Sequence, residues 1–223
     1  VQAKFGKPIT GVVDAELWEL ISKEADWPGK FERCLGLVAA FEGHGYTKAA
    51  GNWDKAGITW GIIGFILITC GKVKKKTVLK YGPLRDLLKE AFVKHEATMI
   101  AAFGDGQAKV LKQMLDATPD DLYRFAVQVS DGKKNFVLRP EWQQAFATLG
   151  GDPAIRELQR AFAKRLYYDP SMKDAEKFGK EFDMASERTD QLFFDIQVNN
   201  GGLGRKLEFP KAKAALKALL VAH

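Results

Sequence analysis

The chain has 223 residues, of which 46% are hydrophobic and 28% are charged, so it can bury a substantial core and has the composition of a globular protein. Its longest apolar stretch, residues 58–70, is too short to span a bilayer, and we expect no stable membrane insertion. The net charge of +6 favours anionic partners, which include nucleic acid, anionic lipid and the acidic polymers of bacterial walls.

Patterns for nucleic-acid, metal and cofactor binding are weak. The densest basic cluster, residues 72–76, has no interleaved aromatic residues, and it favours a solvated loop or a helix start over a nucleic-acid site. None of the three histidines stands at a spacing that binds zinc, so we expect no metal and no cofactor. Cys34 and Cys70 lie in apolar stretches, which favours buried thiols, although a disulfide between them stays open.

Helical patterns dominate the chain from its beginning. Residues 14–23 carry apolar residues at helical spacing after an Asp suited to the N-cap, and a Trp-Pro-Gly breaker follows within 26–29. Residues 31–41 then place one apolar face at helical spacing, and we expect a second helix there.

The next segment departs from this pattern. Residues 43–57 are rich in Gly and Asn, and they favour a loop with a small hairpin around Tyr46 and Ile58. The apolar run 60–70 is typical of a buried helix. Further amphipathic helices are expected at 84–103, 107–116, 120–130, 140–149, 153–168, 173–186, 189–199 and 210–221. Four of them have a proline at a plausible first turn, at positions 119, 140, 153 and 210. The expected fold class is therefore mainly α (α+β), with one small β-hairpin.

Two carboxylic acids in unlike surroundings mark residues 41–65 as the segment that carries chemistry. Glu42 ends an apolar helix beside a glycine-rich loop, where an apolar wall favours the protonated acid. Asp54 lies in a polar loop and can stay ionised, and a hairpin would return the Thr59 hydroxyl to the same cleft. Hydrolysis of a glycosidic bond needs such a pair, because one carboxyl protonates the leaving oxygen while the other activates water. The spacing alone also fits an ordinary helix end followed by a polar loop.

A resemblance to a known family favours the catalytic alternative. The run from Asp54 to Phe65 resembles the catalytic loop of family 46 glycoside hydrolases, the chitosanases, in which Asp precedes a GYTAGIIGF-like segment. Gly61-Ile62-Ile63-Gly64-Phe65 matches that segment residue for residue. Chitosanases belong to the lysozyme-like superfamily, so the resemblance implies a lysozyme-like helical domain with the β-hairpin beside the active-site cleft. It also implies hydrolysis with inversion at the anomeric carbon.

The resemblance implies roles for individual residues. Glu42 would be the general acid, while Asp54 and Thr59 would hold the attacking water. The run Phe193-Phe194-Asp195-Ile196-Gln197-Val198 is similar to an aromatic-Asp helix of the family, which would place Asp195 in a polar network supporting the acid. An amphipathic helix that merely carries one Asp fits that run equally well.

Three aromatic residues flank the carboxylates. Tyr46, Trp53 and Trp60 could stack on sugar rings, although aromatic residues beside a loop are also common in protein cores. Trp60 stands where the family has a small residue, and the loop between Glu42 and Asp54 is shorter than we expect for chitosanases. Both departures affect the substrate cleft and leave the identity of the polysaccharide open.

Residues 5–18 are similar to the closing half of a helical peptidoglycan-binding module, with its Gly-Val-Val-Asp turn followed by a Leu-Trp pair. Any turn followed by a capped helix can also give this pattern. We therefore expect the end of a peptidoglycan-binding-like module at 1–26 and a lysozyme-like glycoside hydrolase domain at 27–223.

Charge favours peptidoglycan as the substrate, because a protein of net charge +6 is attracted to wall polymers with free carboxylates and repelled by polycationic chitosan. The expected function is a muramidase of the endolysin type, acting as a monomer at the cell wall or in the periplasm, although no signal peptide is visible. Chitosan hydrolysis is the alternative. A non-catalytic wall-glycan-binding protein is a further alternative, and binding to nucleic acid rests on net charge alone.

Overall fold

A computed structural model of the chain describes residues 6, 16, 28–43, 45–51, 55–73, 76–131, 136–182 and 185–201. The chain divides into two compact units, Val1–Arg33 and Cys34–His223. The peptidoglycan-binding-like module expected at 1–26 and the helix expected at 210–221 lie outside the described residues, apart from two isolated positions in the former. The described elements from Cys34 onward belong to the second unit.

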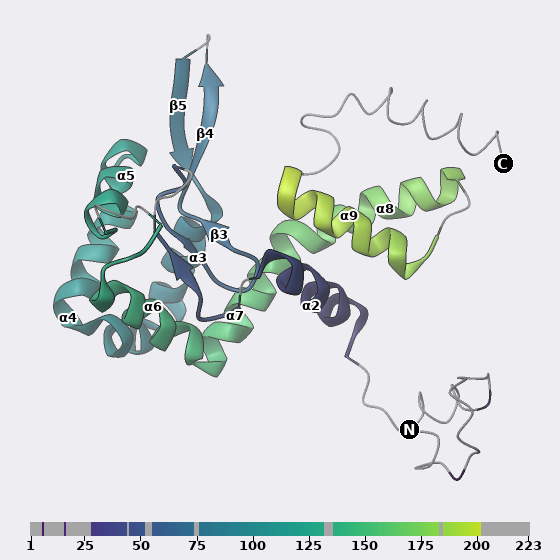
Figure 1. Ribbon diagram of the computed structural model, residues 1–223, viewed down its shortest axis with the longest axis horizontal. Coiled ribbons are helices and arrows are strands. Elements are labelled where there is room, and N and C mark those ends of the chain that lie inside the picture. Colours follow the sequence, from purple (N-terminus) through teal and green to yellow (C-terminus); the bar gives the residue numbers. More distant parts are fainter. Residues whose placement is uncertain are drawn as a thin grey trace. The chain divides into compact units, whose positions relative to one another are not determined.

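Helices form most of the described chain, which confirms the mainly helical α+β class (Figure 1). The helix α2 begins in the first unit and ends in the second. The helices are α2 (Lys30–Glu42), α3 (Pro83–Lys94), α4 (Glu96–Leu115), α5 (Pro119–Gln128), α6 (Pro140–Gly151), α7 (Pro153–Ala163), the π-helical turn η2 (Lys164–Tyr168), α8 (Asp169–Phe182) and α9 (Glu187–Asn200).

The starts of the central helices follow the sequence signals. Pro119, Pro140 and Pro153 each stand in the first turn of a helix, where the missing N–H removes no intrahelical bond. The single helix expected over 84–103 is wrong, because the chain breaks at His95 with φ −140° and ψ 42° and then continues as α4.

The β-structure is larger than the sequence indicated. Strands β1 (Ala49–Ala50), β2 (Thr59–Trp60) and β3 (Phe65–Ile66) form an antiparallel sheet in that order, so a hairpin does lie in the expected region. The buried helix expected over 60–70 is wrong. Gly61 and Gly64 adopt φ 92° and 67°, and these left-handed conformations reverse the chain between β2 and β3.

A second hairpin follows, formed by β4 (Ile68–Val73) and β5 (Lys76–Tyr81) (Figure 1). Its register pairs Thr69 with Lys80 and Val73 with Lys76. Part of the basic cluster at 72–76 therefore lies in two strands, and the solvated loop or helix start expected there is wrong for those positions. Thr69, Val78 and Lys80 share one face of this hairpin, because directly paired residues and alternate residues point the same way.

Aromatic side chains join β2 to helices α4 to α6. Trp60 is fully buried, its ring centroid lies 5.5 Å from that of Phe146, and its indole Nε1–H donates to the Phe146 carbonyl at 3.1 Å. The ring of Phe103 continues the cluster 5.2 Å from Phe146. Each such ring pair adds roughly 0.5–1.5 kcal/mol beyond the area it buries. The core therefore fixes β2 directly against α6.

The two cysteines are not joined in a disulfide. Cys34 is buried in α2, as expected, whereas Cys70 is exposed in β4, so the expected burial is wrong for Cys70. Within the described part of the chain, every helix is too short or too polar to span a lipid bilayer.

Candidate functional site

Glu42 is the last residue of α2, and its surroundings define the end of that helix. Gly43 takes the left-handed conformation at φ 60°, and its N–H donates to the Ala40 carbonyl at 3.3 Å. The Lys48 ammonium group donates to the Gly43 carbonyl at 2.8 Å and places a positive charge at the negative end of the helix dipole. The half-buried Glu42 side chain therefore extends from a helix end that Gly43 and Lys48 hold in place.

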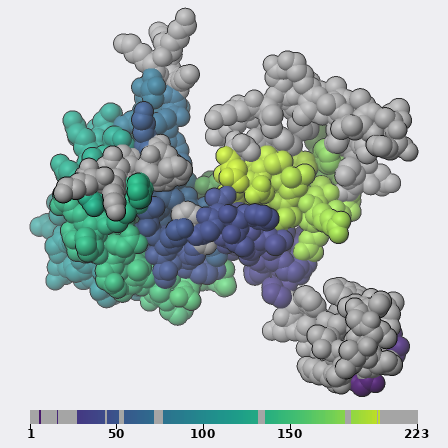
Figure 2. All heavy atoms as spheres, in the orientation of Figure 1, coloured from purple at the N-terminus to yellow at the C-terminus, as the bar shows by residue number. Residues whose placement is uncertain are grey.

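Glu42 and Asp195 both line a groove of about 490 Å³. Figure 2 shows α9 next to the end of α2 on the surface of the molecule. The side chains from α9 stand three or four residues apart, so one face of that helix forms the groove wall. The described lining residues are Phe41, Glu42, Arg188, Gln191, Leu192, Asp195 and Asn199.

Asp195 has an oriented carboxylate. The Asn199 amide donates to Asp195 Oδ1 at 3.2 Å and to the Asp195 carbonyl at 3.3 Å, which ties the side chain to its own helix. The Ser186 hydroxyl begins α9 by accepting from the Thr189 N–H at 3.2 Å, and Gly201 ends the helix at φ 70°. The polar group expected to support the acid is therefore held by a helix that is capped at both ends.

Gln191 contributes an amide oxygen that is available to a ligand. Its Oε1 is buried and has no hydrogen-bond partner in the structure described here. Leaving such an acceptor unsatisfied costs about 1–3 kcal/mol, which a ligand hydroxyl in the groove would recover. Arg188 adds a guanidinium group to the same wall. Neither Gln191 nor Arg188 was predicted as a site residue, although their helical spacing from Asp195 is visible in the sequence.

The water-positioning residues are placed only in part. Thr59 lies in β2, paired with Ala50 and Ile66, and only 7% of it is exposed. It is not among the described residues that line the groove at Glu42. Asp54 and Trp53 lie outside the described residues, so the facing arrangement of Glu42 and Asp54 stays a prediction.

Gln159 holds the two chain segments that flank β1 and β2. This fully buried α7 residue donates from Nε2 to the Tyr46 carbonyl at 3.1 Å and accepts at Oε1 from the Ile62 N–H at 3.0 Å. A Cβ at Gly61 would lie 2.6 Å from the same Oε1, so only glycine fits there. The Gly61–Phe65 run therefore forms a turn around an amide from a distant helix. No local sequence signal could have identified Gln159.

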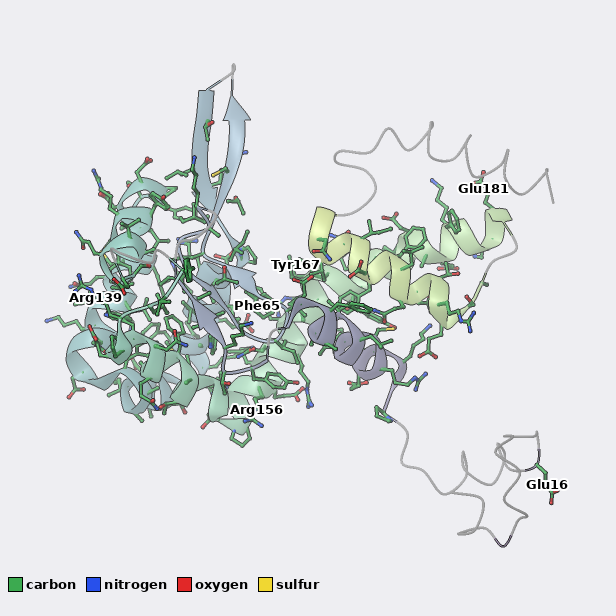
Figure 3. All side chains as sticks on the ribbon, in the orientation of Figure 1. Glu16, Phe65, Arg139, Arg156, Tyr167 and Glu181 are labelled. Carbon is green, nitrogen blue, oxygen red and sulfur yellow. The ribbon has the colours of Figure 1, made fainter. Side chains whose placement is uncertain are left out.

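The two described aromatic residues that were expected to contact sugar, Tyr46 and Trp60, differ in their exposure. Tyr46 is half-buried, and the Arg156 guanidinium (labelled in Figure 3) lies 5.5 Å from the centre of its ring. Stacking of Tyr46 on a sugar stays a prediction. Trp60 is 0% exposed and belongs to the core. A ring with no exposed face cannot stack on a sugar, so this burial argues against the substrate-binding role expected for Trp60.

Replacing Trp60 by Phe tests that correction. The change removes the hydrogen bond to Phe146 and part of the packed ring, and it should lower the free energy of unfolding by about 1–3 kcal/mol. Glycan affinity of the folded variant should not change. Denaturant unfolding and calorimetric glycan titration measure the two effects. Weaker glycan binding at unchanged stability would restore Trp60 to the binding site.

Comparison of the chain with models of protein families gives no match, and comparison with curated proteins gives none either. The geometry of the groove and the motif between Asp54 and Phe65 are therefore the observations that bear on function.

Proposed function

We propose that the chain is a lysozyme-like glycoside hydrolase with Glu42 as its general acid. The observation that carries the proposal is the shared groove of Glu42 and Asp195. Phe41 and Leu192 stand beside these carboxyls with 81% and 53% of their surface exposed, which offers apolar contact to the flat face of a sugar ring. A carboxyl beside exposed apolar side chains fits a site that holds a sugar ring next to a general acid.

The proposed reaction is a single displacement by water. Glu42 donates its proton to the glycosidic oxygen, Asp54 takes a proton from the attacking water, and the Thr59 hydroxyl orients that water. The water then adds to the anomeric carbon as the bond to the leaving sugar breaks, which inverts the configuration. This mechanism needs the two carboxyls about 6.5–9.5 Å apart so that a water molecule fits between them.

Peptidoglycan is the proposed substrate. The net charge of +6 and the Arg188 guanidinium in the groove favour a polymer with free carboxylates over a polycation. The chain would then act as a muramidase of the endolysin type at the cell wall. Chitosan hydrolysis is the second candidate, and the match at Gly61–Phe65 is what favours it.

Incubation with purified peptidoglycan and, separately, with chitosan tests the proposal. We expect new reducing ends from peptidoglycan, muropeptide fragments identified by mass spectrometry, and products of inverted configuration in early NMR spectra. Release of glucosamine oligomers from chitosan alone would select the second candidate. Binding of wall glycan with no reducing ends from either polymer would show a non-catalytic binding protein instead.

A further inference from the structure

A second and larger groove, of about 710 Å³, borders α9 away from the Asp195 side. Gln197 lines it, and two residues along a helix turn the side chain by roughly 200°, so Asp195 and Gln197 face opposite ways. The other walls come from the β4–β5 hairpin, the start of α3, the end of α7, η2 and the start of α8. The described lining residues are Thr69, Lys80, Tyr81, Gly82, Pro83, Asp86, Phe162, Leu166, Tyr167, Pro170, Gln197 and Gly201.

Tyr167 supplies a hydrogen-bond donor to this groove. Its ring centroid lies 6.2 Å from that of Phe65 in the Gly61–Phe65 turn (Figure 3), and its hydroxyl has no partner within the described ranges. Burial raises the pKa of Tyr167 to about 12, so the hydroxyl stays protonated at every physiological pH. Thr69 and Gln197 add neutral polar groups, while Leu166 adds apolar surface. Mixed walls of this kind suit a sugar better than a purely apolar ligand.

Lys80 supplies an available positive charge. It is exposed and forms no ion pair with any residue that the structure describes. A Cβ at Gly71 would lie 3.1 Å from Lys80 Cε, so the side chain crosses the strand where glycine leaves room. The Asp86 carboxylate, in contrast, is already paired with Arg85 at 3.0 Å. Among the described lining residues, Lys80 is therefore the charged side chain without an ion pair.

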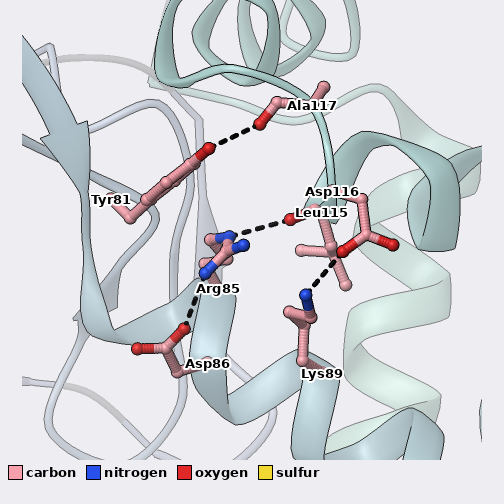
Figure 4. Close-up of polar contacts among 7 residues, drawn as sticks. All are labelled: Tyr81, Arg85, Asp86, Lys89, Leu115, Asp116 and Ala117. Atoms are coloured by element: carbon pink, nitrogen blue, oxygen red, sulfur yellow. Dashed lines mark hydrogen bonds and ion pairs between the residues drawn. The ribbon is translucent and has the colours of Figure 1, made fainter.

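The wall that carries Tyr81 is held in place by several contacts (Figure 4). The Tyr81 hydroxyl donates to the Ala117 carbonyl at 2.8 Å, and the Arg85 guanidinium lies 3.9 Å from the centre of the Tyr81 ring. Arg85 Nε donates to the Leu115 carbonyl at 2.8 Å. These contacts fix the base of the hairpin against the end of α4, so a ligand meets a preformed surface and orders little of it on binding.

We propose that this second groove binds a carboxylate-bearing segment of an acidic glycan chain. Lys80 pairs with the carboxylate, and the Tyr167 hydroxyl donates to a polar atom of a neighbouring sugar. The inference rests on the proposed function only in identifying the glycan as wall peptidoglycan, whose lactyl-linked stem peptides carry free carboxylates. It assigns to the groove a specificity that chitosan, a polycation, cannot satisfy.

Calorimetric titration of the full-length chain tests this assignment. The Glu42→Gln background keeps ligands intact, and the probes are a peptidoglycan tetrasaccharide with its stem peptides and the neutral N-acetylglucosamine tetramer. Lys80→Gln should weaken binding of the peptidoglycan probe about 3- to 5-fold and leave the neutral tetramer unchanged. The matched control, Lys109→Gln, removes the same charge from an exposed position on α4 and should change neither affinity. Added salt should reduce the Lys80 effect.

Tyr167→Phe gives an independent readout. It should weaken both probes about 3- to 10-fold, because the donor contacts sugar rather than the charged peptide, and the melting temperature should not fall. Equal losses for Lys80→Gln and Lys109→Gln, or equal losses of both probes on Lys80→Gln, would overturn the assignment. If cleavage depends on Glu42 but Lys80→Gln binds both probes like the parent, the hydrolase proposal stands and the binding role of the second groove is refuted. If binding depends on Lys80 but the parent chain cleaves nothing, the binding role of the groove stands and the hydrolase proposal is refuted.

Discussion

Replacing Glu42 by Gln is expected to reduce release of reducing ends from peptidoglycan by about 10²–10⁴-fold, the range that loss of a general acid produces. Gln has nearly the same shape as Glu but has no proton to give to the leaving oxygen. The side chain stands half-buried at the end of α2, and the Gly43 turn and Lys48 hold that end through backbone atoms, so the fold should not change. Turbidity clearing of wall sacculi and a reducing-end assay measure the loss.

Glu141→Gln is the matched control, because it makes the same change at an exposed position in the first turn of α6. It should keep parental activity. A circular dichroism spectrum and a melting temperature equal to those of the parent would show that Glu42→Gln is folded. Activity within a few-fold of the parent in folded Glu42→Gln would remove Glu42 from the mechanism and would leave Asp195 without an acid to support.

The helices could be predicted because their signals are local. Pro119, Pro140 and Pro153 each stand in the first turn of a helix, and apolar residues at helical spacing follow each of them within a few turns. The run 60–70 misled because a short apolar run has the same composition in a buried helix and in buried strands. Gly61 and Gly64 decide between these two structures through their positive φ, which the sequence permits but does not require.

The candidate site, like the fold, could be predicted only where its signals are local in the sequence. Glu42 was predicted from its place at the end of an apolar helix beside glycine, and Asp195 from the resemblance of residues 193–198 to a family motif. Their meeting in one groove depends on how α9 packs, which no local pattern specifies. Trp60 illustrates the opposite error, because its place beside Thr59 suggested a sugar contact while its packing on Phe146 puts it in the core.

The second large effect is expected from Gln159→Leu. This change removes both hydrogen bonds of the buried amide and leaves the Tyr46 carbonyl and the Ile62 N–H without their partner. Each unsatisfied group costs about 1–3 kcal/mol, so the free energy of unfolding should fall by about 2–6 kcal/mol. Denaturant unfolding followed by fluorescence measures the change.

Gln113→Leu is the control, because it makes the same substitution at an exposed position within α4 and should change stability little. Gln159 lies 97 residues from Ile62 and 113 from Tyr46, so its bonds join segments on both sides of the strand that carries Thr59. If Thr59 orients the attacking water, turnover by folded Gln159→Leu should fall while glycan affinity holds, because misplacing that hydroxyl affects the chemical step more than binding. Parental turnover in a destabilised but folded variant would show that the hydrogen bonds of Gln159 serve the fold alone, and would weaken the assignment of Thr59.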